Sequence, residues 1–321
     1  MTFQRDTAAA RAPVDGALEG RVARLFFERQ LTKVEIATRL GISRFRVARL
    51  LDRALAEGIV RIEFRDTPAQ DRALGRRVED RFGVGRCVVS ESDDDRAVAR
   101  LGAEVIDGLL DPGDAIGIAW GSTVARVVRA MPARDDATID IVQLAGSSTS
   151  LDANEDPGDL TRVLAERLGA RHHRIHAPAF VESTELRGAI VRQPEVAATV
   201  VRFDGLAVAV LGIGSFGGHD GGASSSLLRS GALSTGEIAG LTGVGAVGDL
   251  IVHPFTADGQ FVAPDLAARA IAISIEQLRA VPTVVAVAAG RAKVGAIRGA
   301  LATGVIGVLV TDAATAAGLV A

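Results

Sequence analysis

The sequence has no tyrosine, one cysteine (Cys87) and two lysines (Lys33 and Lys293). A single cysteine excludes a disulfide framework and a zinc site built from several cysteines. Long apolar runs are also missing, because the longest uncharged stretch, Gly205 to His219, is shorter than the roughly 20 residues that a membrane helix needs. Residues 1–15 carry charges where a secretory signal would need an apolar segment. We therefore expect a soluble cytoplasmic protein.

Apolar material is abundant: 48% of the 321 residues are hydrophobic, and the net charge is only −3. This combination excludes a disordered chain, and the length predicts two domains. The charge is divided unevenly, since residues 1–65 hold 13 basic and 8 acidic side chains, a net of +5, which leaves −8 for the remainder. A basic N-terminal region on an acidic remainder indicates that only the N-terminal region contacts a polyanion.

Residues 17–65 are predicted to form a helical DNA-binding domain behind a disordered tail at 1–16. Apolar residues recur at helical spacing from Ala17 onward. Thr32 can cap a second helix, and Ser43, after the break at Gly41-Ile42, can cap a third helix that ends near Glu57. The predicted buried face of the third helix consists of Val47, Leu50, Leu51, Ala54 and Leu55. The alternation from Ile59 to Phe64 predicts a strand.

Two helices joined by a glycine turn, the second rich in arginine, are typical of a helix-turn-helix or winged-helix domain. The recognition helix needs long cationic side chains because arginine can pair with guanine edges and also hold phosphates. A solvated charged helix face is the alternative, and the combination of turn, cap and charge favours DNA. The predicted DNA-binding residues are Ser43, Arg44, Phe45, Arg46, Arg49 and Arg53.

After a predicted linker helix at residues 66–82, short apolar segments alternate with helical ones through residues 83–321. This alternation predicts a Rossmann-like, doubly wound parallel sheet with helices on both faces. Ligands of such sheets bind at the carboxyl ends of the strands. The predicted strands are Cys87–Ser90, Ala115–Ala119, Ile139–Leu144, Arg171–His176, Leu206–Gly212, Thr283–Ala288 and Val305–Val310.

Gly121, Ser122 and Thr123 follow a predicted strand and open a helix, which is the arrangement that binds phosphate through backbone N–H groups and the helix dipole. An ordinary capped turn is equally compatible with these residues alone. Lys293 begins another predicted helix, where an ammonium group could contact an anion or simply lie in solvent. Asp249, predicted in a turn before a strand, could accept hydrogen bonds from sugar hydroxyls or cap the turn.

Other motifs carry less weight. Gly212-x-Gly214-x-x-Gly217 matches the dinucleotide fingerprint, but the glycine-rich residues that follow cannot open the helix that the motif requires. His172 and His176 on one strand would lie about 13 Å apart, too far to share a metal ion. The sequence therefore predicts no metal site and no cofactor. His219-Asp220 fits a polar loop as well as a catalytic pair.

Several motifs follow one another along the chain: Leu40-Gly41-Ile42-Ser43-Arg44, Trp120-Gly121-Ser122-Thr123, Val142-Gln143-Leu144, Gly212-Ile213-Gly214, Gly245-Ala246-Val247-Gly248-Asp249, Ile273 to Leu278, Ala288 to Lys293 and Leu309-Val310-Thr311-Asp312. Together they resemble the SorC-type (SorC/DeoR) family of sugar-binding transcriptional regulators. The ordered set spans about Ala17 to the C-terminus. At Gly146 the chain departs from the family pattern, because Ser147-Ser148 follow where paired glycines are common.

The resemblance implies a cytoplasmic bacterial regulator of carbohydrate metabolism, a homodimer or homotetramer that binds a double-stranded DNA operator. Its effector domain would be similar to sugar-phosphate isomerases and deaminases without being catalytic, and would bind a phosphorylated sugar. The effector-binding residues so implied are Gly121, Ser122, Thr123, Gly146, Ser147, Asp249 and Lys293.

Two other classes of function remain as alternatives. A sugar-phosphate isomerase or deaminase with an accessory DNA-binding domain would need a positioned acid and base, and the chain offers only His219, Asp220 and Asp249 for these roles. A sugar-binding scaffold that does not bind DNA is disfavoured by the arginines of the third helix. We therefore expect a regulator with no catalytic residues.

Overall fold

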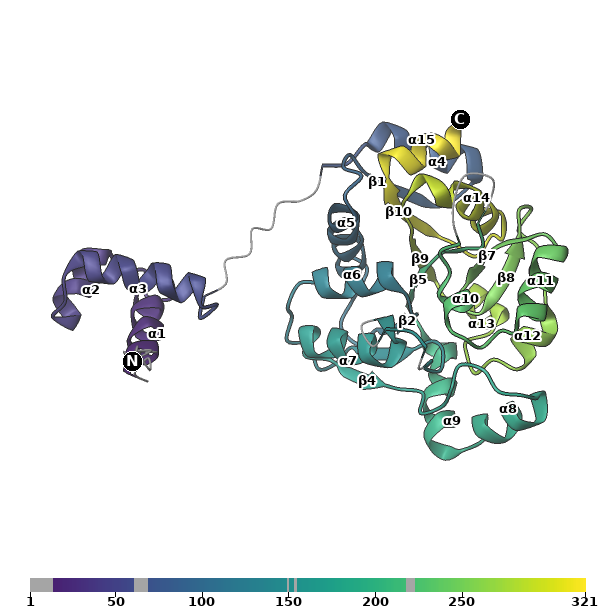
Figure 1. Cartoon of the computed structure of the whole chain (residues 1–321), viewed down its shortest axis with the longest axis horizontal. Coiled ribbons are helices and arrows are strands. Elements are labelled where there is room, and N and C mark those ends of the chain that lie inside the picture. Colours follow the sequence, from purple (N-terminus) through teal and green to yellow (C-terminus); the bar gives the residue numbers. More distant parts are fainter. Residues whose placement is uncertain (1–13, 61–68, 149, 153–154, 218–222) are drawn as a thin grey trace, which may run out of the picture. The chain divides into compact units, whose positions relative to one another are not determined.

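A computed structural model describes residues 14–60, 69–148, 150–152, 155–217 and 223–321. The chain divides into two units, residues 1–66 and 67–321, which we call the head and the body (Figure 1). Each unit has its own hydrophobic core. No helix in these ranges combines the length and the apolar character that crossing a bilayer requires.

The head contains three helices: α1 (Val14–Phe27), α2 (Lys33–Leu40) and α3 (Arg44–Ala56). Thr32 caps α2 in a capping box with Glu35, and Ser43 accepts a hydrogen bond from the Arg46 N–H at the start of α3. Gly41, between the two helices, has a φ of 64°, a left-handed conformation that glycine adopts without strain. These features confirm the predicted turn and caps.

Apolar side chains from all three helices form the core of the head, including Val22, Ile36, Val47 and Leu50. Leu55, predicted to be buried, is 41% exposed. The helix α1 begins three residues before the predicted start at Ala17. Ile59 and Val60 lie in a bend rather than in a strand, and the rest of the predicted strand, residues 61–64, lies outside the described residues.

The body is built on a seven-stranded sheet with the order β1-β10-β9-β5-β2-β3-β4, in which every pair of neighbours is parallel. All seven predicted strands belong to it, which confirms the predicted fold class. Their bounds are β1 Arg86–Ser90, β2 Ala115–Ile118, β3 Asp140–Gln143, β4 Arg171–His173, β5 Val208–Gly212, β9 Thr283–Val287 and β10 Val308–Asp312. From β2 the chain continues to β3 and β4 toward one edge of the sheet, and from β5 it continues to β9 and β10 toward the other edge. The strand order therefore reverses between β2 and β5.

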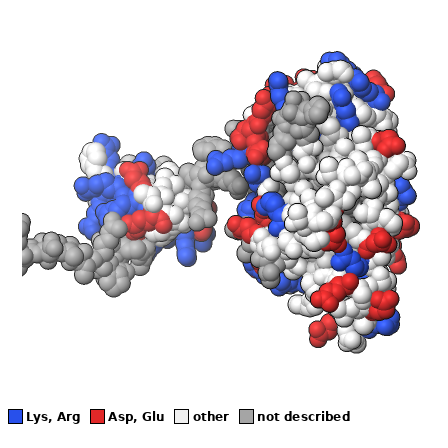
Figure 2. Space-filling model, turned by 45° about the vertical axis from the view of Figure 1, so that its right-hand side comes forward, with Lys and Arg blue, Asp and Glu red and all other residues white. Residues whose placement is uncertain are grey.

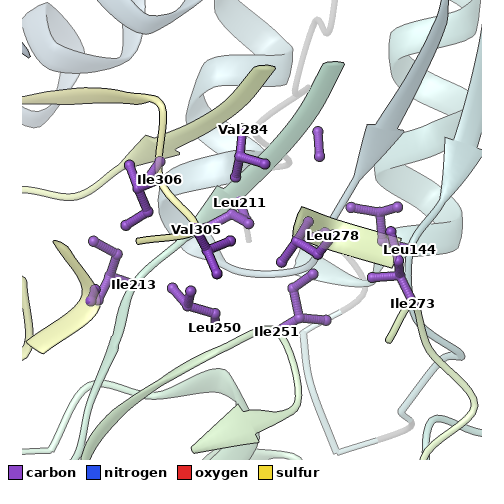
Figure 3. Close-up of a cluster of buried hydrophobic side chains, with 14 of the residues drawn as sticks. Leu144, Leu211, Ile213, Leu250, Ile251, Ile273, Leu278, Val284, Val305 and Ile306 are labelled. Carbon is purple, nitrogen blue, oxygen red and sulfur yellow. The ribbon is translucent and has the colours of Figure 1, made fainter. Parts of the chain in front are cut away.

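Helices cover both faces of this sheet, as expected for a doubly wound fold. One face packs against α5 (Asp95–Asp107), α6 (Ser122–Ala130) and α7 (Pro157–Leu168). The other packs against α4 (Arg72–Phe82), α13 (Ile275–Ala280), α14 (Val294–Ala302) and α15 (Ala313–Val320). Side chains from distant parts of the chain meet in this second core, where Leu144, Leu211 and Leu278 lie together with Ile273 and Val305 (Figure 3). Successive strand residues alternate between the two cores.

The segment predicted as a linker at residues 66–82 is helical from Arg72 and is part of the body. Its Leu74 and Val78 are buried against the sheet, and Gly75 lies so close to the Cys87 carbonyl oxygen that a Cβ there would be 2.5 Å from it. The predicted helix is therefore present, with its charges on the outer face and its apolar inner face packed on the body.

A second, three-stranded antiparallel sheet was not predicted. It contains β6 (Gly214–Ser215), β7 (Ala246–Leu250) and β8 (His253–Thr256) in that order. Short helices complete the body: α8 Thr184–Val191, α9 Pro194–Val200, α10 Ser226–Arg229, α11 Thr235–Gly243, α12 Pro264–Ala268 and the 3-10 helices Val201–Gly205 and Arg291–Lys293. The short strand β6 directly follows β5, so the small sheet adjoins the point where the strand order reverses.

Candidate ligand cavity and nucleic-acid interface

The N-terminus of α6 lies at the carboxyl end of β2 and has no side-chain cap. The preceding Gly121 has a φ of 116°, which only glycine adopts readily. By contrast, the neighbouring helices α5 and α7 are capped by Asp94 and Asp156. The Gly121 N–H donates to the Glu155 carbonyl oxygen (3.2 Å), so the N–H groups available to a ligand are those of the first turn of α6, beside the Ser122 and Thr123 hydroxyls.

A cavity of about 350 Å³ opens in front of this helix end, and we call it the switch-point cavity. It lies where the strand order reverses, which is where doubly wound sheets bind their ligands. Gly121, Ser122, Thr123, Asp249 and Lys293 all line it, although they lie up to 172 positions apart in the sequence. The structure therefore brings together five of the seven residues that the sequence analysis assigned to effector binding.

Three cations surround the switch-point cavity, and the sequence analysis found only one of them. Lys293 donates to the Ile213 carbonyl oxygen (Nζ to O, 3.0 Å). Arg126 pairs with Asp95 at 3.2 Å, and Arg229 pairs with Glu155 at 2.7 Å. Arg126 follows Ser122 by four residues, one helical turn, and this spacing could have predicted it. Arg229 lies on the short helix α10, and no spacing in the sequence predicted that it would reach this cavity.

Asp249 was predicted in a turn, but it lies within β7 and is only 2% exposed. Its Oδ1 accepts a hydrogen bond from the Ser225 hydroxyl at 2.5 Å. A Cβ on Gly214 would lie 2.0 Å from this oxygen, so a glycine at 214 makes room for the carboxylate. Burial raises the pKa of Asp249 to about 7, against the lowering effects of Ser225 and Lys293. Burial likewise lowers the pKa of Lys293.

Gly146 and Ser147 do not line the switch-point cavity. Gly146 is buried beneath the backbone of Pro178, where a Cβ would lie 2.5 Å from the carbonyl group. Ser147 donates to Asp156 (Oγ to Oδ1, 3.2 Å) and lines a neighbouring cavity. Both residues follow β3, whose carboxyl end is next to that of β2. The strand was predicted correctly, but its loop separates these two residues from the other five.

The remaining motifs of the sequence analysis have structural outcomes. Gly212 is followed by β6 and not by a helix, so the dinucleotide fingerprint lacks its required context. His173, next to His172, contacts the Asp140 carboxylate at 2.9 Å. Within the described ranges, no group of three or more histidine, cysteine or acidic side chains is arranged to hold a metal ion. His219-Asp220 lies outside the described residues.

The exposed surface of α3 presents Arg44, Phe45, Arg46 and Arg49, and Figure 2 shows basic side chains gathered on the head. Phe45 is 67% exposed and lies under the Arg44 guanidinium, 4.8 Å from the ring centre. An exposed set of arginines on the second helix of a helix-turn-helix, none of them in an ion pair with another described residue, is suited to the major groove.

Arg53, also predicted to bind DNA, has a structural partner. Its guanidinium pairs with Glu19 of α1 at 3.3 Å, and the Glu19 side chain is almost fully buried. A buried carboxylate needs a compensating charge, so Arg53 joins α3 to α1. The sequence did not reveal this pair because Glu19 lies on a different helix.

Comparisons with known proteins agree with this architecture. The family model Sugar-bind, a sugar-binding domain, matches residues 66–321. The sorbitol operon regulator of Klebsiella pneumoniae is 30% identical over 304 residues, covering 92% of this chain and 95% of that protein. The erythritol catabolism regulatory protein EryD of Brucella abortus is 29% identical over 316 residues, covering 96% and 98%. The crystal structure of full-length SorC from K. pneumoniae matches with a TM-score of 0.73 at 29% identity, covering 96% of this chain and 100% of that one.

The chain belongs to the SorC-type family of sugar-binding transcriptional regulators. The matches to both relatives cover nearly the whole chain, so they include the head as well as the body. These relatives are named as regulators and not as enzymes. This SorC-type protein is therefore a transcriptional regulator, and the alternative of an isomerase or deaminase is not supported.

Proposed function

We propose that this regulator binds a DNA operator through Ser43, Arg44, Phe45, Arg46 and Arg49, and that a phosphorylated sugar in the switch-point cavity controls its affinity for the operator. The observation that carries the proposal is the uncapped N-terminus of α6 facing a cavity with three cations. Free N–H groups at a helix start, a positive dipole end and nearby cations are the features that bind phosphate.

The sugar portion of the ligand would lie toward Asp249. A carboxylate accepts hydrogen bonds from hydroxyl groups, and Asp249 lines the side of the cavity formed by β6 and β7. The names of the relatives, a sorbitol operon regulator and an erythritol catabolism regulator, support a carbohydrate or polyol derivative as the ligand class. No part of this scheme requires a cofactor, and we propose that the ligand alone is the signal.

We further propose that the protein acts in the cytoplasm as a homodimer or homotetramer. A single helix-turn-helix buries little surface on DNA, whereas two heads on half-sites one helical turn apart add their binding energies. Ligand binding to the body would change operator affinity if it favours one arrangement of the heads over another.

The test uses the full-length protein and a DNA fragment that it selects from a random pool. Trp120, the only tryptophan, lines the switch-point cavity, so its fluorescence reports ligand binding directly. We expect a hexose or pentose phosphate to change this fluorescence and, at the same concentrations, the affinity for the fragment. The proposal fails if sugar phosphates change neither quantity, or if the fragment binds equally well to the Arg44→Ala, Arg46→Ala, Arg49→Ala triple variant.

A further inference from the structure

A second cavity of about 810 Å³ lies at the carboxyl ends of β3 and β4, and we call it the outer cavity. It shares no lining residue with the switch-point cavity. Glu155 and Arg229 line the switch-point cavity, while the adjacent residues Asp156 and Ser230 line the outer one, so the Glu155–Arg229 ion pair is part of the wall between them. The outer cavity is therefore a separate candidate site.

Arg174 of the outer cavity has a donor without a partner. Its Nε is buried and makes no hydrogen bond to any of the described residues. Its guanidinium lies against Gly158 in the first turn of α7, because a Cβ there would be 2.9 Å from one of the guanidinium nitrogens. Asp156 and Asp159 offset the positive end of the α7 dipole there, but neither accepts a hydrogen bond from this Nε. A buried donor without a partner is explained by an acceptor that a ligand would supply.

The rest of the lining of the outer cavity is rich in hydroxyl and carboxylate groups. Asp156 uses Oδ1 for Ser147 and the first N–H groups of α7, and its Oδ2 makes no hydrogen bond within the described chain. Ser148 and Ser150 also line the cavity, and Phe180 contributes an apolar surface. Carboxylate acceptors, an arginine donor and an aromatic ring are together complementary to the hydroxyl groups and C–H faces of a carbohydrate.

The charges of the outer cavity differ from those of the switch-point cavity. Asp156 and Asp159 outnumber Arg174, which gives the lining a net negative charge, and Asp156 occupies the N-terminus of α7 as its cap. This occupied helix end cannot receive a phosphate, unlike the open one of α6. We propose that the outer cavity binds an uncharged sugar or polyol, independently of the ligand of the switch-point cavity.

The test uses the single cysteine of the chain. Cys87 is buried and its pKa is raised to about 12 by that burial, so it is unreactive toward thiol reagents while the protein is folded. An added Ala232→Cys places a reactive thiol in the outer cavity, and Ser224→Cys places one in the switch-point cavity. Labelling of each full-length variant by a disulfide reagent is followed with tetritols, pentitols, hexitols, the corresponding aldoses and their monophosphates.

We expect at least one uncharged compound to slow labelling of the Ala232→Cys thiol and to leave the Ser224→Cys thiol unaffected. The factor is 1 + [L]/Kd, or about tenfold at a concentration ten times Kd. Arg174→Gln, added to Ala232→Cys, should remove the protection, whereas Arg171→Gln, on β4 but outside the cavity, should retain it. Continued inertness of Cys87 shows that each variant is folded.

The inference is overturned if no uncharged compound protects the Ala232→Cys thiol, or if only sugar phosphates protect it and do so together with the Ser224→Cys thiol. The second result would make the outer cavity an extension of the phosphate site. Failure of sugar phosphates to protect the Ser224→Cys thiol bears only on the proposed effector, so the two proposals fail separately.

Discussion

Replacing Asp249 by asparagine should stabilise the body at alkaline pH. Burial raises the pKa of Asp249 from 3.8 to about 7 in the folded protein. Below pH 3.8 the carboxyl group is protonated in both states and contributes nothing. Between these values the folded state retains a proton that the unfolded state releases, so stability falls as the pH rises, and the full penalty applies above pH 7. An increase of about 3 in the pKa corresponds to about 4 kcal/mol in the free energy of unfolding.

Asparagine has the same shape and can still accept from Ser225, but it cannot ionise. The free energy of unfolding of Asp249→Asn relative to wild type should therefore increase by about 3 kcal/mol between about pH 5 and about pH 8.5. Urea unfolding followed by the fluorescence of Trp120, which is buried in the body, measures this difference. Asp265→Asn, at an exposed position, controls for the loss of a carboxylate. A difference between Asp249→Asn and wild type that is constant with pH would refute a carboxylate destabilised by burial.

Three further predictions separate the roles of individual residues. Arg49→Ala should weaken operator binding by about 1–3 kcal/mol without lowering the melting temperature of the head. Arg53→Ala should instead destabilise the head by about 1–3 kcal/mol, because it leaves Glu19 buried without its partner. Equal effects of the two variants on operator affinity, measured by anisotropy, and on melting temperature, measured by calorimetry, would contradict this division. Thr123→Ala and Lys293→Ala should abolish the effect of a sugar phosphate on operator affinity, while Lys33→Ala, at the only other lysine, retains it; titration calorimetry with unchanged ligand affinity would count against the site. Operator affinity should fall steeply with salt concentration, and the slope should become smaller in the Arg44→Ala, Arg46→Ala, Arg49→Ala variant, because each phosphate contact releases counterions. An identical slope would show that these arginines do not contact DNA phosphates.

The parallel sheet could be predicted because its strands are buried on both faces and therefore appear as short apolar runs between glycine-rich turns. The run Thr283–Val287 is an example, since its residues after Thr283 are all buried. The caps at Thr32 and Ser43 were equally readable, because a cap depends on residues three positions apart. Features that depend on residues close together in the sequence can therefore be predicted from it.

Contacts between distant segments could not be predicted. The strand β7 contains a glycine and an aspartate, residues with low strand propensity, and it forms because Gly214 and Gly248 allow β6 and β7 to approach closely. The burial of Asp249 and the partnership of Arg53 with Glu19 both depend on such pairings. The same limitation applies to Ser147, which the sequence analysis grouped with Gly121, Ser122 and Thr123, whereas it lines the outer cavity. The strand that precedes it does not determine which wall its loop joins.

The switch-point cavity concentrates features that oppose stability. α6 begins without a cap, and capping typically contributes about 1 kcal/mol. Asp249 is buried and Lys293 is half-buried, and the loss of hydration shifts the pKa of each toward its neutral form, so their mutual attraction does not compensate for that loss. A phosphate at α6 would supply the missing acceptor for the helix and a counter-charge for Lys293. The body should therefore gain more stability from its ligand than a preformed, neutral cavity would. Only the part of this gain that differs between the two arrangements of the heads is available for changing operator affinity.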